Sequence, residues 1–404
     1  MLIAAAQLIT AADETDPVPT EGLVELTDGL ITRVVPGSPS TDVRAATGAR
    51  PDVVLPDGYL VPGFVDVQVN GYFGAEFQTA DAASWADVAC RLPATGTTAF
   101  VPTLITAPID SLIAELSTAA GFVGALPDTG ARVLGLHVEG PFISPDRRGA
   151  HNPAWITDPT PAAVAALIEA GGGLLRLLTI APERPGALAA IEQLTAAGVL
   201  VSVGHSDATA EQVGAAASAG ARMVTHLFNA QRPLGHREPG VVGQALVDER
   251  LTSGLIVDLY HVAAPVCGLA FRAAPGRIAL VTDAAAPAGM PPGEYFLGGE
   301  PITLPPALGS PPVRSDGTLA GSALRMDLAV ANAVRCGVSL AAAVAAATRI
   351  PANLIGKPNL GRLAPGATAD LVWLSPDLRT RATWLDGRLV YTDGADATLA
   401  LLRA

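Results

Sequence analysis

Two rhythms of apolar and polar residues divide the chain. Near the N-terminus, short runs such as GLVELTDG and LITRVV alternate apolar and polar positions between polar turns, which is typical of half-buried antiparallel strands. From Gly361 onward, three more strand-like runs follow, and LDG supplies a hairpin turn signal. We therefore expect one small β-sandwich domain, residues 1–60 plus 361–404, to which both ends of the chain contribute strands.

The rest of the chain, residues 61–360, repeats a different rhythm, in which a short apolar strand ends in polar residues and an Ala-rich helical stretch follows. Eight such strands can be counted: GFVDVQVNG, TTAFVPTLIT, RVLGLHVEG, LLRLLTIAPE, LVSVGHSDAT, ARMVTHLFNA, LTSGLIVDLYHV and RIALVTDAAAP. Apolar strands that alternate with helices indicate a parallel sheet, and this number of them indicates an α/β fold of the (β/α)8 barrel type. An open doubly wound sheet is the alternative.

The positions of the polar residues favour the barrel. A polar side chain sits at or just past the carboxyl end of every predicted strand: Asn70, Thr103, Glu139, Glu183, His205, His226, His261 and Asp283. The active-site rim of a barrel collects such ends from all of its strands. An open sheet would concentrate them at a single switch point.

Charge limits the possible partners. The chain has 25 basic and 38 acidic residues, which gives a formal net charge of -13. Nucleic acid or an anionic membrane surface would be repelled, because no local basic stripe offsets that charge. A ligand that carries a phosphate must therefore be held by a few placed groups and backbone amides.

The cysteines and the first residues indicate the compartment. Cys90, Cys267 and Cys336 are far apart and form no C-x-x-C pair, which argues against a disulfide framework and against a cysteine zinc site. The start, MLIAAAQLIT, lacks the basic residues of a signal peptide, and no apolar run reaches the length of a membrane span without interruption. We expect a cytoplasmic protein.

Three of the strand-end residues suit a metal ion. All six histidines lie in the barrel segment: His137, His151, His205, His226, His236 and His261. Glu139, His205 and His226 each end an apolar strand, and carboxylate plus neutral imidazole are good ligands for a borderline metal such as Zn²⁺. Three protein ligands leave a fourth position for water, as in catalytic sites. The competing interpretation is that each is a hydrogen-bonded polar group in the barrel mouth.

Asp283, in VTDAAAPAG, ends the eighth predicted strand. A carboxylate that faces an activated water can accept its proton and later deliver it to a leaving amine. Alternatively, Asp283 caps a following helix, but Ala-Ala-Ala-Pro is a poor first turn to cap. We expect Asp283 to be the catalytic acid and base.

Seven motifs carry a family resemblance: PGFVDVQVNG, GLHVEGPFISPDRRGAHNP, SVGHSDAT, THLFNAQRPLGHREPG, LIVDLYHV, VTDAAAPAG and LAGSALRMD. Through them the sequence resembles the N-acetylglucosamine-6-phosphate deacetylases of the amidohydrolase superfamily, over nearly the whole chain. The resemblance implies a metal held by Glu139, His205 and His226 and a catalytic Asp283. Both assignments agree with the interpretation of the residues alone.

The resemblance also implies the substrate contacts. His151 is expected to polarise the acetamide carbonyl, and Arg237 and His261 are expected to bind the substrate, chiefly its phosphate, which suits a guanidinium fork. Further contacts are implied for Ala150, Asn229 and Ala230. A homodimer is implied too, in which Arg237 reaches into the neighbouring site.

The segment LAGSAL contains a glycine that would let backbone amides approach a ligand. It adds four candidates for substrate binding, although a plain helix entry explains them too: Leu319, Ala320, Gly321 and Ser322.

The first barrel strand ends in Gln68 and Asn70, where many members of the superfamily carry His-x-His and hold two metals, often with a carboxylated lysine on the fourth strand. The single lysine, Lys357, lies outside the predicted fourth strand, so a carbamate bridge is not available. Amides bind a divalent ion far less well than imidazoles do. We therefore expect one divalent metal ion, Zn²⁺, while Gln68 and Asn70 could equally pack or hydrogen-bond at the barrel floor.

Weaker signals concern four other residues. His137 lies two residues before Glu139, on the same side of the strand, and is expected as a buried, hydrogen-bonded histidine rather than an extra ligand. Glu183 could support the site or serve a structural role. Arg147 and Arg148 fall in a predicted loop and are expected at the surface.

Together these features predict hydrolysis of the acetamide of N-acetylglucosamine 6-phosphate to glucosamine 6-phosphate and acetate. One alternative is an amidohydrolase that acts on another N-acyl amine or a cyclic amide. Another is a non-catalytic barrel that has lost its activity, which the joint presence of the metal candidates and Asp283 argues against.

Overall fold

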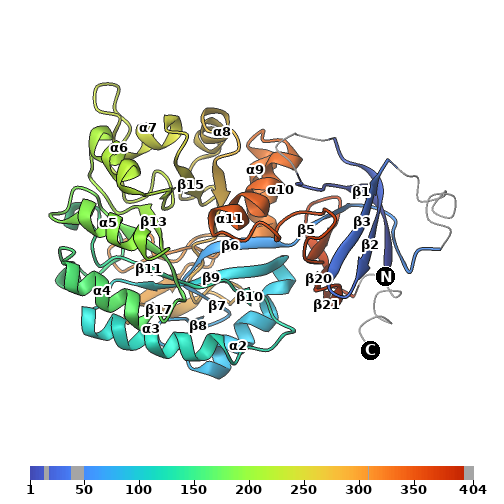
Figure 1. Ribbon diagram of the computed structural model, residues 1–404, viewed down its shortest axis with the longest axis horizontal. Coiled ribbons are helices and arrows are strands. Elements are labelled where there is room, and N and C mark those ends of the chain that lie inside the picture. Colours follow the sequence, from blue (N-terminus) through green and yellow to red (C-terminus); the bar gives the residue numbers. More distant parts are fainter. Residues whose placement is uncertain (13–17, 38–49, 308, 395–404) are drawn as a thin grey trace.

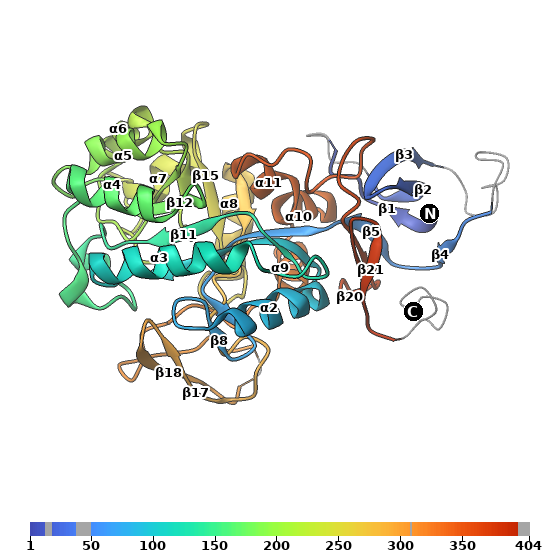
Figure 2. The same cartoon turned by 60° about the horizontal axis from the view of Figure 1, so that its bottom comes forward.

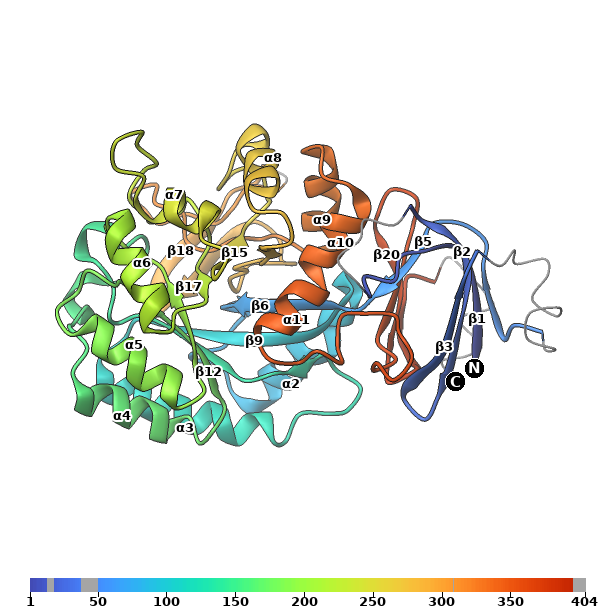
Figure 3. The same cartoon turned by 45° about the horizontal axis from the view of Figure 1, so that its top comes forward.

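The protein consists of a barrel and a terminal sheet that lie side by side (Figure 1). Its structure is a computed structural model that describes residues 1–12, 18–37, 50–307 and 309–394. Three helices lie between the barrel and the terminal sheet (Figure 3): α9 (Met326–Arg335), α10 (Leu340–Ala347) and α11 (Arg349–Leu354).

Parallel strands in sequence order form the barrel. They are β6 (Phe64–Val69), β9 (Thr97–Ile105), β11 (Leu136–Glu139), β12 (Leu175–Ile180), β13 (Leu200–Val203), β14 (Met223–Val224), β15 (Thr252–Leu255) and β16 (Ile278–Leu280). The short strand β10 (Arg132–Val133) pairs with the first half of β9. Each of the eight apolar segments counted in the sequence contributes one barrel strand, so the predicted (β/α)8 barrel is confirmed.

The barrel closes between its first strand and the segment that follows its last. The N–H of Asp283 donates to the carbonyl of Gln68 at 3.0 Å, and the N–H of Asn70 donates to the carbonyl of Ala284 at 2.8 Å. This seam therefore brings Gln68, Asn70 and Asp283 together at the carboxyl end of the barrel.

Helices cover the outside of the barrel and pack their apolar sides on the strands. They are α2 (Ala82–Arg91), α3 (Ile109–Val123), α4 (Pro161–Ala170), α5 (Ala187–Ala196), α6 (Ala210–Ala219), α7 (Gly240–Val247) and α8 (Ala264–Ala273). In α3, for example, the fully buried Leu112 and Leu116 are one turn apart and so share one face. Among the described residues, no helix combines the length and the apolar character needed to cross a membrane.

The terminal sheet contains strands from both ends of the chain. They are β1 (Leu2–Leu8), β2 (Thr20–Thr27), β3 (Leu30–Pro36), β4 (Val53–Leu55), β5 (Tyr59–Pro62), β19 (Leu371–Leu374), β20 (Thr380–Leu385) and β21 (Arg388–Thr392). Strand β5 pairs antiparallel with β19 and so joins the two ends. As expected, both ends of the chain contribute strands to one unit, and hydrogen bonds link them into a mixed sheet. At the predicted LDG hairpin, Asp386 and Gly387 have φ of 48° and 72°, which is the backbone of a tight two-residue turn.

Two small hairpins follow the first and the last barrel strand. The first is formed by β7 (Gly71–Tyr72) and β8 (Ala75–Glu76), and the second by β17 (Gly293–Leu297) and β18 (Glu300–Leu304). Figure 2 shows the β17–β18 hairpin projecting from the barrel. Its inner side packs on Ile105 and Ala285, so it extends the wall of the barrel mouth.

Candidate metal centre and active site

A cavity of about 250 Å³ lies at the carboxyl ends of the barrel strands. Many of the residues predicted for the site line it: Asn70, Glu139, Ala150, His151, His205, His226, Asn229, Ala230, His261, Asp283, Leu319 and Gly321. They come from loops far apart in the sequence, and the barrel brings them together because the carboxyl ends of its strands meet at one rim.

Glu139, His205 and His226 converge on one point. Glu139 Oε1 lies 3.1 Å from His205 Nε2 and 3.0 Å from His226 Nε2, and the two nitrogens are 3.1 Å apart. All three side chains are buried. A triangle of this size accommodates an ion about 2.0–2.2 Å from each corner, which is the range of Zn–N and Zn–O bonds.

The proton positions around this triangle call for a cation. His205 Nδ1 lies 2.9 Å from the carbonyl oxygen of Arg147, which can only accept, so Nδ1 carries the proton. In a neutral imidazole Nε2 is then a lone pair, and it faces a carboxylate oxygen of Glu139. Two acceptors at this distance repel each other unless a proton or a metal ion lies between them. The donor set therefore fits a divalent metal ion.

The electrostatics of the triangle point the same way. Burial opposes ionisation of Glu139, but the two imidazoles in contact with its carboxylate, His205 and His226, hold its pKa well below the usual value. Burial also disfavours the charged form of His226, yet the Glu139 carboxylate outweighs it and raises the pKa of that imidazole. Both pKa shifts indicate that positive charge is favoured beside the Glu139 carboxylate, and a divalent ion supplies such charge.

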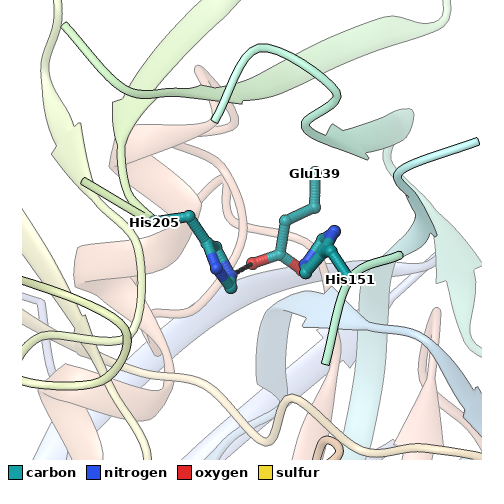
Figure 4. Close-up of side chains that lie close together, drawn as sticks. All are labelled: Glu139, His151 and His205. Atoms are coloured by element: carbon teal, nitrogen blue, oxygen red, sulfur yellow. Dashed lines mark hydrogen bonds and ion pairs between the residues drawn. The ribbon is translucent and has the colours of Figure 1, made fainter. Parts of the chain in front are cut away.

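His151 approaches Glu139 from another side (Figure 4). Ligand atoms of Glu139, His151 and His205 all lie within 4.8 Å of one another, and the His151 ring packs edge-on against His205 with centroids 4.4 Å apart. Burial lowers the pKa of His151 to about 3, so the ring is neutral near pH 7. Either His151 or His226 could complete a three-residue metal site with Glu139 and His205, but His226 lies nearer to both partners.

Asp283 is held beside Glu139 by two amides. Gln68 Nε2 donates to Glu139 Oε1 at 3.2 Å and to Asp283 Oδ1 at 3.1 Å, and Asn70 Nδ2 donates to Asp283 Oδ1 at 2.7 Å. Burial, followed by the charge of Glu139, raises the pKa of Asp283 to about 6. A carboxylate with a pKa this close to neutral can both accept and return a proton.

Three of these residues leave their strands with a left-handed backbone. The φ angle is 47° at His205, 27° at His226 and 49° at Asp283. Such a conformation costs a residue other than glycine about 1–3 kcal/mol, and it persists at functional sites where the surrounding structure imposes it. No motif in the sequence indicates this backbone conformation.

The predicted substrate residues divide into two groups. His261 lines the cavity, and its Nδ1 donates to Asp258 Oδ2 at 2.6 Å, which fixes the ring. By contrast, Arg237, Ala320 and Ser322 are not among the residues that line this cavity. Arg237 is exposed on a loop, Ala320 is buried, and Ser322 donates its hydroxyl to a backbone carbonyl at 2.5 Å.

The cavity also has lining residues that sequence reasoning missed: Ile105, Gly149, Ile256, Leu297 and Thr318. Leu297 belongs to the β17–β18 hairpin, and no motif marks it. Thr318 immediately precedes the predicted segment LAGSAL, so a slightly wider window would have found it.

A parallel barrel whose mouth gathers a carboxylate, converging imidazoles and a second carboxylate defines the class of metal-dependent barrel hydrolases. The model of the amidohydrolase family matches residues 59–269 and 277–390.

Three similar proteins identify the family within this class. An N-acetylglucosamine-6-phosphate deacetylase from Danio rerio is 38% identical over 82% of this chain and 84% of its own length. An N-acetylgalactosamine-6-phosphate deacetylase from Escherichia coli O157:H7 is 36% identical over 91% of this chain and 94% of its own. The structure of a variant N-acetyl-D-glucosamine-6-phosphate deacetylase from Mycobacterium smegmatis, in complex with N-acetyl-D-glucosamine-6-phosphate, superposes with a TM-score of 0.89 at 36% identity, over 97% of this chain and 99% of that one. The chain belongs to the N-acetylglucosamine-6-phosphate deacetylases of the amidohydrolase family.

Proposed function

We propose that the protein hydrolyses the acetamide of N-acetylglucosamine 6-phosphate, and that the products are glucosamine 6-phosphate and acetate. The observation that carries this proposal is the convergence of Glu139, His205 and His226 beside Asp283 in one cavity. The relatives named above act on phosphorylated N-acetyl sugars, which supports the substrate class.

Glu139, His205 and His226 would hold one divalent ion, and we propose Zn²⁺ because one carboxylate and two imidazoles are a common catalytic zinc set. When bound, such an ion polarises the amide carbonyl and lowers the pKa of water. Gln68 and Asn70 already donate to carboxylates, which supports a single-ion site.

Asp283 would move the proton. As the carboxylate, it accepts a proton from the attacking water; as the acid, it returns that proton to the nitrogen of the departing amine. Its raised pKa suits both steps, and Gln68 and Asn70 keep Oδ1 in place between them. Water thus adds to the carbonyl carbon, the C–N bond breaks, and acetate and the amine leave.

His151 would donate to the carbonyl oxygen as negative charge develops there. Its Nδ1 lies 2.7 Å from the Thr106 hydroxyl. The Thr106 hydroxyl also donates to the Glu139 carbonyl at 3.2 Å, so Thr106 links the His151 ring to the strand end that carries Glu139.

The phosphate end of the substrate would lie toward His261, Asn229 and Ala230, with Arg237 as the charged partner. Arg237→Ala should impair turnover of the phosphorylated sugar far more than turnover of unphosphorylated N-acetylglucosamine. Equal effects on both would favour an amidohydrolase with a different N-acyl substrate.

We also propose a homodimer in a reducing, cytoplasmic setting. Arg237 is exposed and does not line the cavity of its own chain, which suits a residue that serves a neighbouring site. Cys90, Cys267 and Cys336 are all free thiols, as a reducing compartment requires. Sedimentation equilibrium would give the mass of the assembly, and a monomer would remove this part of the proposal.

The decisive experiment measures acetate release and metal content on the same sample. N-acetylglucosamine 6-phosphate and N-acetylgalactosamine 6-phosphate should be compared, because relatives of both kinds match this chain. We expect one equivalent of zinc and a higher kcat/KM for the gluco sugar. A metal-loaded protein that releases no acetate from either sugar would refute the proposal.

A further inference from the structure

Four consecutive loops at the barrel mouth meet at Asp207. Arg147, from the loop after β11, donates to Asp207 Oδ1 through Nε at 2.8 Å and Nη2 at 2.7 Å. Arg232, from the loop after β14, donates to Asp207 Oδ2 at 2.6 Å. Glu183, after β12, accepts from the Asp207 N–H at 2.6 Å and from the Ser206 hydroxyl at 2.7 Å.

This junction lies directly against the candidate metal centre. The backbone carbonyl of Arg147 accepts the Nδ1–H of His205 at 2.9 Å, the bond that leaves His205 Nε2 as a lone pair toward Glu139. The Arg147 loop continues into His151, four residues further on. The Arg147 side chain thus anchors its own loop to Asp207. The backbone of that loop orients His205, and the same loop carries His151.

The junction also reaches the loop with the candidate substrate contacts. The N–H of Ser206 donates to the carbonyl of Ala230 at 3.1 Å, and the N–H of Arg232 donates to the carbonyl of Ser206 at 3.0 Å. Asp207 follows Ser206 directly, so its two arginine partners hold this loop and the His151 loop to the same carboxylate.

The ion pairs at Asp207 are too exposed to be a major source of global stability. The side chains of Arg147, Asp207 and Arg232 are 32%, 29% and 33% exposed. Solvent screens pairs of this kind, and their net contribution to folding is small. What they fix is geometry, because a guanidinium that donates twice to one carboxylate oxygen restricts both partners.

We propose that Asp207 and Arg147 are positioning residues for the metal centre: their contact keeps the Arg147 carbonyl on His205 and keeps His151 over the cavity. Neither side chain contacts the three converging ligand atoms. The proposal deepens the proposed function and rests on it for the role of His151, whereas its effect on metal binding can be measured without substrate.

The test replaces Arg147 with methionine, which retains the length of the side chain and the backbone carbonyl but loses both bonds to Asp207. Arg148→Met is the matched control, because Arg148 is the adjacent exposed arginine and its side chain has no partner within the described part of the chain. Three quantities are measured: zinc affinity by competition with a chelator, kcat and KM, and the unfolding midpoint of the metal-free protein.

Loss of a partner that orients a metal ligand costs about 10- to 100-fold in metal affinity or activity. For Arg147→Met we expect a zinc dissociation constant raised by this factor and a reduced kcat, with the unfolding midpoint of the metal-free protein unchanged. Arg148→Met should match the wild type in all three. An unchanged zinc affinity overturns the proposal, and so does a midpoint lowered in proportion, since that would mark a structural role.

Asp207→Asn provides an independent variant, and a double-mutant cycle with Arg147→Met tests the contact itself. If the two residues act through each other, the double variant should lose little more zinc affinity than either single variant. Fully additive losses would contradict the proposal. A wild type that binds zinc but releases no acetate would refute the proposed function alone, because the zinc measurements would still decide the role of Asp207.

Discussion

The barrel mouth has two halves built from equivalent strand ends. On one half, after β11, β13 and β14, the candidate ligand atoms of Glu139, His205 and His226 converge. On the other half, at the seam between β6 and the segment after β16, the amides of Gln68 and Asn70 point N–H donors at carboxylate oxygen. The first half demands a cation at its centre, whereas the second satisfies its carboxylate without one.

The difference shows how a carboxylate pair can be stabilised without a second ion. Glu139 and Asp283 repel each other, and the charge of Glu139 contributes to the raised pKa of Asp283. Gln68 Nε2 donates to both carboxylates at 3.1–3.2 Å and so lies where the repulsion is strongest. Hydrogen bonds to an ionised group favour its charged form, as a nearby cation would. An amide therefore carries out part of the electrostatic work of a metal.

The largest effect should come from breaking the first half. His226→Ala removes one of the three proposed zinc ligands. Loss of a residue that only supports a ligand costs up to about 100-fold in metal affinity, so the zinc dissociation constant should rise by more than that factor. Acetate release should fall with zinc content. Zinc content and acetate release are measured on one sample. Normal zinc binding in this variant would exclude His226 as a ligand and favour a site formed by Glu139, His151 and His205.

A second large effect should come from Asp283→Asn on the other half. Loss of a general acid and base costs about 10²- to 10⁴-fold in rate, so kcat should fall by that factor while the zinc content stays near one equivalent. The assay is acetate release with metal analysis, and wild type treated in parallel is the control. Activity that survives the substitution would show that another group moves the proton.

An intermediate effect is expected for Gln68→Met, which keeps the volume of the side chain but removes both donors. A hydrogen bond to a charged group contributes about 1.5–3 kcal/mol, and about 1.4 kcal/mol corresponds to tenfold in rate, so kcat should fall about tenfold or more. Zinc should still bind. Loss of zinc in this variant would mean that Gln68 is needed for metal binding, so that the two halves do not act independently.

The smallest effect is a thermal shift. A ligand at about 100 times its dissociation constant stabilises the folded state by about 2.7 kcal/mol, which for a chain of this size raises the unfolding midpoint by a few degrees. Zinc should produce this shift in the wild type and in Gln68→Met but not in His226→Ala. Equal shifts in all three would indicate that zinc binds elsewhere.

Much of the site could be predicted from the sequence because barrel strands are short apolar runs whose polar ends all reach one rim. Glu139, His205 and His226 were found in this way, and the structure brings them together at 3.0–3.1 Å. His137 was expected as a buried, hydrogen-bonded residue, and it contacts Thr103 at 3.1 Å and Thr179 at 2.8 Å.

What the sequence could not provide depends on contacts between distant loops. Arg147 was expected merely at the surface, yet it contacts Asp207, 60 residues away in the chain. Leu297 enters the cavity from a hairpin with no motif of its own. Alternation predicted strands at both ends of the chain but not which strand edges pair, and these pairings link the terminal strands into one mixed sheet.

The seam that closes the barrel has a consequence for the order of assembly. Its backbone hydrogen bonds join Gln68 to Asp283 and Asn70 to Ala284, so Asp283 reaches its place only when the first and last barrel strands meet. Glu139, His205 and His226 follow strands that lie between these two. During refolding, zinc capture should therefore precede the return of acetate release, and a time course that recorded both signals would register them as separate events.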